Sequence, residues 1–128
     1  MTLSGLMGSL NYWSVGALGV MFVGKFLGGG GMITEIAQIE IKPGTEKDYE
    51  AAIAKAVALP SPSGFHGFEL HRSIEKPQRY RFIARWDSVE AHNAFRASPS
   101  FAEWRALVGK YYAAPPDVEH TETVVSTF

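Results

Sequence analysis

His92 is the residue in this sequence best suited to act as a general base. It lies in a segment expected to form a helix that faces a sheet, one turn before Phe95 and Arg96. Imidazole titrates near neutral pH, so it can take a proton from an acidic substrate group. The alternative, a partly exposed helix histidine without a chemical role, stays open at this level.

Arg85 offers a fixed positive charge that could stabilise the anion formed by such a base. His92 and Arg85 are therefore the candidate catalytic residues. Arg81 could serve in the same way. Pairing of either arginine with a carboxylate such as Glu69 or Glu119 is an equal alternative.

Aromatic side chains at helical spacing could form the walls of a substrate pocket. Phe101, Trp104 and Tyr111 lie on one stripe, although such a stripe is often simply core. His71 lies within an expected strand and, with the simplest hairpin register, shares a face with Phe82; a structural cross-strand role is the alternative. The candidate substrate-binding residues are Trp104, Phe101, Tyr111, His71 and Phe95.

The composition excludes several other kinds of site. The chain has 128 residues, no cysteine and a net charge of −1, from 12 Lys+Arg and 13 Asp+Glu. Without cysteine there is no thiolate nucleophile or cysteine-based metal site, and no concentrated positive charge is present for nucleic acid. The four histidines are scattered, and no phosphate-binding loop is visible. We expect no metal, no other cofactor and no nucleic-acid partner.

Hydrophobic periodicity and turn residues predict the elements that must position these side chains. In chain order they are a strand at 33–41, a helix after residue 45, a hairpin of strands at 65–74 and 79–86, helices starting near 87 and 98 and ending before 115, and a strand at 118–125. Thr45 and Asp87 are the expected N-caps of the first two helices, and Ser98 that of the third.

This order is β-α-β-β-α-β, which indicates a ferredoxin-like α+β sandwich with helices on one face of an antiparallel sheet. Neither face of the strand at 79–86 has the character of plain solvated surface. One face carries Tyr80, Phe82, Ala84 and Trp86, and the other carries Arg79, Arg81, Ile83 and Arg85. We therefore expect two chains to pair their sheets in a homodimer.

Residues 1–31 form a leader that is separate from the domain at 32–128. Lys25 is its only charged residue, and its closing run of four glycines is typical of a flexible joint. Residues 3–27 are long and apolar enough for a transmembrane helix with membrane-protein partners, which would leave the domain on the cytoplasmic side. The alternatives are a docking peptide for a soluble partner, or an extension foreign to a protein that starts at Met32.

From residue 32 onward the sequence resembles the antibiotic biosynthesis monooxygenase (ABM) family of dimeric α+β barrels. The segments that carry the resemblance are 41–44 (IKPG), 64–72 (GFHGFELHR), 85–92 (RWDSVEAH), 95–98 (FRAS), 101–105 (FAEWR) and 115–120 (PPDVEH). The resemblance implies a homodimer with a pocket in each subunit between sheet and helices. It also implies mixed chemistry, because members of this family include cofactor-free oxygenases, haem-degrading enzymes and isomerases.

The haem-degrading branch of the family uses an asparagine on the first strand, a tryptophan on a helix and a histidine that ligates iron. The corresponding positions here are Ala37, Phe95 and Arg105. Alanine and phenylalanine lack the polar group, and arginine does not ligate iron. Haem degradation by that mechanism is therefore disfavoured.

The resemblance and the candidate residues together predict a cofactor-independent monooxygenase that acts on a quinol-like or polyphenolic small molecule. In the alternative hypothesis the domain is a non-catalytic accessory subunit, anchored by residues 3–27 in a membrane protein complex.

Overall fold

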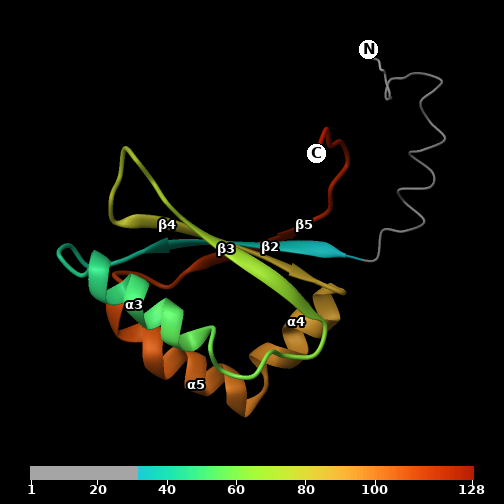
Figure 1. The fold of residues 1–128 in the computed structure, drawn as a ribbon, viewed down its shortest axis with the longest axis horizontal. Helices are drawn as coiled ribbons and strands as arrows, with labels where there is room; N and C mark the ends of the chain where they lie inside the picture. The colour runs from blue at the N-terminus through green and yellow to red at the C-terminus, as the bar shows by residue number, and fades with distance from the viewer. Residues whose placement is uncertain (1–31) are drawn as a thin grey trace. The chain divides into compact units, whose positions relative to one another are not determined.

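The structure is a computed structural model that describes residues 32–128 (Figure 1). The expectations for residues 1–31, including the membrane helix at 3–27, its membrane partners and the anchored accessory subunit, concern residues outside this range. Within the described range no helix has the length and apolar character that are needed to cross a membrane.

A four-stranded antiparallel sheet forms one layer of the domain, with the strand order β3-β4-β2-β5. The strands are β2 (Ile33–Glu40), β3 (Phe65–Arg72), β4 (Arg79–Trp86) and β5 (Asp117–Thr121). The first and third predicted strands are confirmed nearly to the residue. The last strand is shorter than predicted, because pairing with β2 ends at Thr121.

Three α-helices lie on the same side of this sheet (Figure 1). They are α3 (Glu46–Ala56), α4 (Val89–Arg96) and α5 (Pro99–Val108), followed by the short 3-10 helix η1 (Gly109–Tyr111). The ferredoxin-like α+β arrangement predicted from the sequence is therefore confirmed for the described chain. The second helical region is divided into α4 and α5 at Ser98 and Pro99, as expected.

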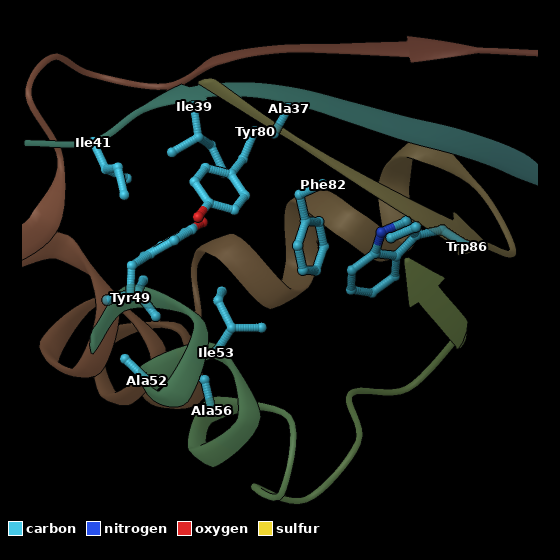
Figure 2. Close-up of a cluster of buried hydrophobic side chains, with 12 residues drawn as sticks. Ala37, Ile39, Ile41, Tyr49, Ala52, Ile53, Ala56, Tyr80, Phe82 and Trp86 are labelled. Atoms are coloured by element: carbon cyan, nitrogen blue, oxygen red, sulfur yellow. The ribbon is translucent and has the colours of Figure 1, made fainter. Parts of the chain in front are cut away.

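The core lies between the helices and the sheet, and it follows from the alternation of the strands. Every second residue of β2 and β4 points toward the helices, and α3 contributes side chains at helical spacing (Figure 2). The buried hydrophobic residues are Ala37, Ile39, Ile41, Tyr49, Ala52, Ile53, Ala56, Tyr80, Phe82, Ala84, Trp86 and Val108.

Two predicted helix caps are wrong in their chemistry. Thr45 is the N-cap residue of α3 as predicted, but its hydroxyl donates to the carbonyl oxygen of Lys42 at 2.6 Å and makes no bond to a helix amide. Ser88, one residue after Asp87, is the N-cap of α4 and accepts from the amide of Ala91 at 3.1 Å. Asp87 bonds His66 instead, so its carboxylate does not reach the helix amides.

The register of β3 against β4 differs from the one assumed for His71. His71 lies opposite Arg81 because the turn pairs Arg72 with Tyr80, and the bulge between Phe65 and Gly67 lies at the other end of β3. Because directly paired residues share a face, His71 lies on the face away from Phe82. The predicted shared face of His71 and Phe82 is therefore wrong.

Candidate functional site

A cavity of ≈ 1110 Å³ lies between the inner face of the sheet and the helices. This volume is slightly above the range of about 300–1,000 Å³ that is typical of pockets for small organic ligands. Aromatic side chains from strands, helices and the segment after α5 dominate its walls: Tyr49, Phe65, Phe68, Phe82, Trp86, Phe95, Phe101, Trp104 and Tyr112. The cavity is therefore suited to a flat, aromatic molecule.

Four side chains from four different elements form a polar cluster in this part of the domain. Trp86 Nε1 on β4 donates to Glu35 Oε1 on β2 at 2.9 Å. The same carboxylate oxygen lies 3.4 Å from His92 Nε2 on α4. A hydrogen bond of 2.8 Å joins His92 Nδ1 to His120 Nε2 on β5. Glu35, His92 and Trp86 also line the cavity, so the cluster is accessible to a ligand.

The surroundings of this cluster fix the geometry of its two buried members. Glu35 is 7% exposed and His92 is 3% exposed. The His92 ring stacks on the Trp86 ring with a centroid separation of 4.8 Å. Because both nitrogens of His92 have partners and its ring is packed, the imidazole is held in one orientation.

Burial shifts the pKa values of Glu35 and His92 in opposite directions. Desolvation raises the pKa of Glu35, partly offset by the hydrogen bond from Trp86 and by the charge of Arg96. Desolvation lowers the pKa of His92 to about 4, with additional contributions from His120 and Arg96. At neutral pH His92 is therefore an uncharged imidazole, and Glu35 is a stronger base than an exposed carboxylate.

Four of the seven predicted site residues line the cavity: His92, Phe95, Phe101 and Trp104. Tyr111 does not line it; this residue is half-buried, and its ring packs against the core at Tyr49 with a centroid separation of 6.2 Å. The prediction that Tyr111 forms a pocket wall is therefore wrong for this structure. The cause is the end of α5 at Val108, after which the chain tightens into η1.

Arg85 and His71 lie on the opposite face of the sheet from the cavity. Arg85 pairs with Thr34 and is exposed, and His71 bonds Glu69 at 2.8 Å on that same outer face. Neither side chain can contact a ligand in the cavity of its own subunit. The arginines that line the cavity are Arg96 on α4 and Arg105 on α5.

Glu35 and His120 are the site residues that the sequence reasoning missed. Residues 33–41 alternate, and Glu35 occupies an inward-facing position between Ile33 and Ala37. A charged residue at such a position is a signal, because burial of a carboxylate is costly without a specific reason. His120 gave a weaker signal, because its role depends on β5 pairing with β2 so that it lies opposite Glu35.

Two proteins with similar sequences are an uncharacterised bacterial protein and a haem oxygenase. The uncharacterised protein YczJ of Bacillus subtilis is 34% identical over 97 residues, which cover 73% of this chain and all of YczJ. A mycobilin-producing haem oxygenase of Mycobacterium tuberculosis is 32% identical over 71 residues, which cover 55% of this chain and 68% of the oxygenase.

The cavity residues do not fit the haem-degrading pattern described above. Ala37, Phe95 and Arg105 all line the cavity, so the three aligned positions do converge there. None of them supplies the required amide, indole or iron ligand.

Solved structures and the family comparison agree with the fold. A crystal structure of a candidate antibiotic biosynthesis monooxygenase from Bordetella bronchiseptica is 49% identical and superposes with a TM-score of 0.72, covering 74% of this chain and 99% of that protein. The sequence pattern of the antibiotic biosynthesis monooxygenase family matches residues 32–107, which include Glu35, Trp86 and His92 but not His120. The chain therefore belongs to the antibiotic biosynthesis monooxygenase family.

Proposed function

We propose that this protein is a cofactor-independent monooxygenase that oxidises a quinol-like or polyphenolic molecule bound in the cavity. Family membership and the haem oxygenase relative support a monooxygenase-like function. The observation that carries the proposal is the buried Glu35–His92 pair in the wall of an aromatic cavity.

Oxygenation without a cofactor requires that the substrate itself becomes an electron-rich anion. A phenolic hydroxyl becomes such an anion when a base removes its proton. Glu35 is suited to this task because its raised pKa brings its basicity closer to neutral pH. His92 remains uncharged at that pH, and because its lowered pKa makes it a weak proton acceptor, its part is to hold the Glu35 carboxylate in place, which its Nε2 contacts at 3.4 Å.

The anion needs a compensating charge in a site from which water is excluded. Arg96 lines the cavity and acts electrostatically on both Glu35 and His92. In this proposal Arg96, and not Arg85 as predicted from the sequence, stabilises the substrate anion. The aromatic walls hold the ring of the substrate and keep the surroundings dry, which strengthens the attraction between Arg96 and a phenolate.

The electron balance of this reaction closes with molecular oxygen alone. The phenolate gives one electron to O₂, and the resulting superoxide joins the ring carbon that carries the radical. The hydroperoxide then loses that carbon's hydrogen as a proton and cleaves its O–O bond, which yields a ring carbonyl and water. With 1-naphthol as the probe, one O₂ gives one 1,4-naphthoquinone and one H₂O.

The test is oxygen uptake with 1-naphthol and related hydroxynaphthalenes, combined with ¹⁸O₂ labelling of the product. We expect one labelled oxygen in the quinone, in the presence of a metal chelator. Both Glu35→Gln and His92→Ala should lower the rate by about 100-fold or more, because each removes a member of the Glu35–His92 pair.

The matched control is Glu119→Gln, because Glu119 lies opposite Ile36 on the outer face of the sheet. This variant should retain the wild-type rate. If Glu35→Gln and His92→Ala consume oxygen as fast as the wild type, the Glu35–His92 pair is not the base. If the wild type fails to oxidise any of these compounds, the proposed substrate class is wrong.

A further inference from the structure

His92 contacts one partner through each nitrogen of its ring. Nε2 lies 3.4 Å from Glu35 Oε1, and Nδ1 lies 2.8 Å from His120 Nε2. The residue is 3% exposed and its ring stacks on Trp86, so the ring is shielded from water. A neutral imidazole carries a single hydrogen, so His92 can donate in only one of these two directions. Its two partners therefore determine which nitrogen carries the hydrogen.

Glu35 Oε1 favours a hydrogen on Nε2 of His92. The same oxygen accepts from Trp86 Nε1 at 2.9 Å, and an indole nitrogen can only donate. Oε1 therefore presents lone pairs to both nitrogens. At 3.4 Å a hydrogen on Nε2 is attracted to this oxygen, whereas a lone pair on Nε2 is repelled by it. Burial of Glu35 and His92 strengthens the preference, because little water screens it.

His120 can supply the complementary hydrogen on the other side of the ring. β5 pairs with β2 so that His120 lies opposite Glu35, and its ring meets the His92 ring at an interplanar angle of 72°. Nε2 of His120 carries a hydrogen in the charged imidazolium and in one of the two neutral forms. Nδ1 of this half-buried residue has no hydrogen-bond partner within residues 32–128. No other contact in the described part of the chain therefore competes for the hydrogen of His120.

The opposite placement of the hydrogens would make Glu35 unfit as a base. His92 would then donate from Nδ1 to His120, and its Nε2 lone pair would face Glu35 Oε1. A protonated Glu35 reduces this repulsion, but a protonated carboxyl group cannot take a proton from a substrate. The direction of the hydrogen bond between His92 and His120 thus decides the chemical state of Glu35.

The second carboxylate oxygen of Glu35 is the one left for a ligand. Oε2 has no hydrogen-bond partner within residues 32–128. In this range only the Tyr49 hydroxyl is both fully buried and without a partner, so Oε2 keeps accessible surface. Because Glu35 lines the cavity, Oε2 is the oxygen that can meet a substrate hydroxyl while Trp86 and His92 contact Oε1.

We propose that His120 is a positioning residue that donates from Nε2 to Nδ1 of His92 and thereby places the single hydrogen of His92 on Nε2, directed at Glu35. His120 does not line the cavity, so it acts through His92. The consequence for Glu35 rests on the proposed function, in which this carboxylate is the base. The placement of the hydrogens itself requires no substrate.

Histidine side-chain NMR measures the position of these hydrogens directly. In two-bond ¹H–¹⁵N correlation spectra of the ¹⁵N-labelled full chain at neutral pH, a ring nitrogen without a hydrogen resonates far from one that carries a hydrogen. The His92 signals are those that His92→Gln lacks. We expect Nε2 of His92 to carry the hydrogen and Nδ1 to lack it. A hydrogen on Nδ1 in the wild type would overturn the inference.

Two substitutions of His120 retain or reverse its role in the hydrogen bond. Lysine can only donate, so His120→Lys should leave Nδ1 of His92 without a hydrogen, as in the wild type. An ionised glutamate can only accept, so His120→Glu should place a hydrogen on Nδ1, in the other neutral form or in the charged imidazolium. A hydrogen on Nδ1 in His120→Lys, or none in His120→Glu, would show that residue 120 does not set this hydrogen.

Thr123→Glu is the control for the added negative charge. Thr123 is exposed and lies two residues after the end of β5, so its replacement adds a carboxylate beyond the strand that carries His120. The His92 signals of this variant should match those of the wild type. A hydrogen on Nδ1 in Thr123→Glu would assign the effect to charge rather than to the hydrogen bond from residue 120, and would overturn the inference.

Oxygen uptake with 1-naphthol measures the consequence for Glu35. His120→Glu should be slower than His120→Lys by about 10-fold or more. In His120→Glu the carboxylate of Glu35 faces either a lone pair, which disfavours its charged form, or an imidazolium, which lowers its basicity. Equal rates would refute this consequence. The spectra require no substrate, so a wild type that fails to oxidise 1-naphthol would count against the proposed function alone, and the spectra would still decide the inference.

Discussion

Glu35 and His92 share one buried environment that favours the uncharged form of each side chain. A carboxyl group is neutral when protonated, so burial raises its pKa; an imidazole is neutral when deprotonated, so burial lowers its pKa. Their contact of 3.4 Å is too long for a strong hydrogen bond. The carboxylate form of Glu35 is the form that can take a proton from a substrate, and its raised pKa makes it a stronger base than an exposed carboxylate.

His92 should make the domain sensitive to acid. Its pKa is about 4 in the folded chain against an ordinary 6.5, so between these pH values the unfolded chain binds a proton that the folded chain does not. The neutral, buried His92 therefore places no penalty on the folded state above pH 6.5. As the pH falls to about 4, proton binding by the unfolded chain lowers the free energy of unfolding by about 3 kcal/mol. In urea unfolding at pH 7 and pH 4.5, His92→Gln should therefore lose less stability than the wild type.

The contribution of Glu35 to the pH dependence of stability has the opposite sign to that of His92. This determines which proteins are compared in the experiment. Because its folded pKa is raised, its contribution is present at pH values below 4.5 and is lost as the pH rises through the raised value. The comparison is therefore between wild type and His92→Gln, both of which contain Glu35. His71→Gln should behave as the wild type, since His71 is exposed. Equal acid sensitivity of all three proteins would contradict the assignment to His92.

At the scale of elements, the position of α4 decides where His92 lies. The side chain of Ser88 caps the first turn of this helix. The loop before β3 packs directly on it at Gly64, whose φ is +82° and whose carbonyl oxygen accepts from the amide of Asp87 at 2.8 Å. A Cβ at Gly64 would lie 2.9 Å from the Cβ of Ala91. A glycine is therefore needed there both for its backbone angle and for the close approach of α4.

Gly64→Ala should destabilise the domain more than Gly44→Ala does. Gly44 has a nearly identical φ of +84°, but a Cβ there meets nothing within 4 Å, so this control isolates the backbone strain. We expect a cost of about 1 kcal/mol for Gly44→Ala and about 1–3 kcal/mol more for Gly64→Ala, measured by urea unfolding. Equal costs for the two variants would show that α4 can move away from Gly64 without penalty.

At the scale of the whole domain, the helices cover one face of the sheet and leave the other open (Figure 1). On the open face Ile36 lies directly opposite Ile83 in the two central strands, and charged residues surround this pair. Members of this family typically form homodimers. An open sheet face with a central isoleucine pair is consistent with the predicted pairing of two sheets in a dimeric barrel.

Ile83→Asp should convert the predicted dimer to a monomer, because it places an unpaired charge at the centre of the two packed sheets. Sedimentation equilibrium of the full chain measures the outcome. The control is Ile74→Asp in the β3–β4 turn, where the side chain is 90% exposed and its replacement should leave the dimer intact. A wild type that sediments as a monomer, or an Ile83→Asp variant that remains dimeric, would show that this face is not the interface.

The sequence by itself determined the strands, the helices and their order. These depend on local patterns: alternation at 33–40 and 79–86, helical spacing at 46–56, and the serine–proline pair at 98–99. The same patterns were sufficient to place His92, Phe95, Phe101 and Trp104 toward the sheet. Local chemistry was less decisive at the caps, where Thr45, Asp87 and Ser88 all have side chains that can accept from a helix amide.

The tertiary structure alone decided which polar residues meet. The β3–β4 turn pairs Arg72 with Tyr80 and so placed His71 opposite Arg81 on the outer face, since side chains in a strand alternate with a period of two. Arg85 lies on that same face for the same reason, and Arg96 takes its place in the cavity. Glu35, His92 and His120 are far apart in sequence and meet only because β5 pairs with β2 under α4. Their burial, and with it their pKa values, arises from this convergence and from no single segment of the chain.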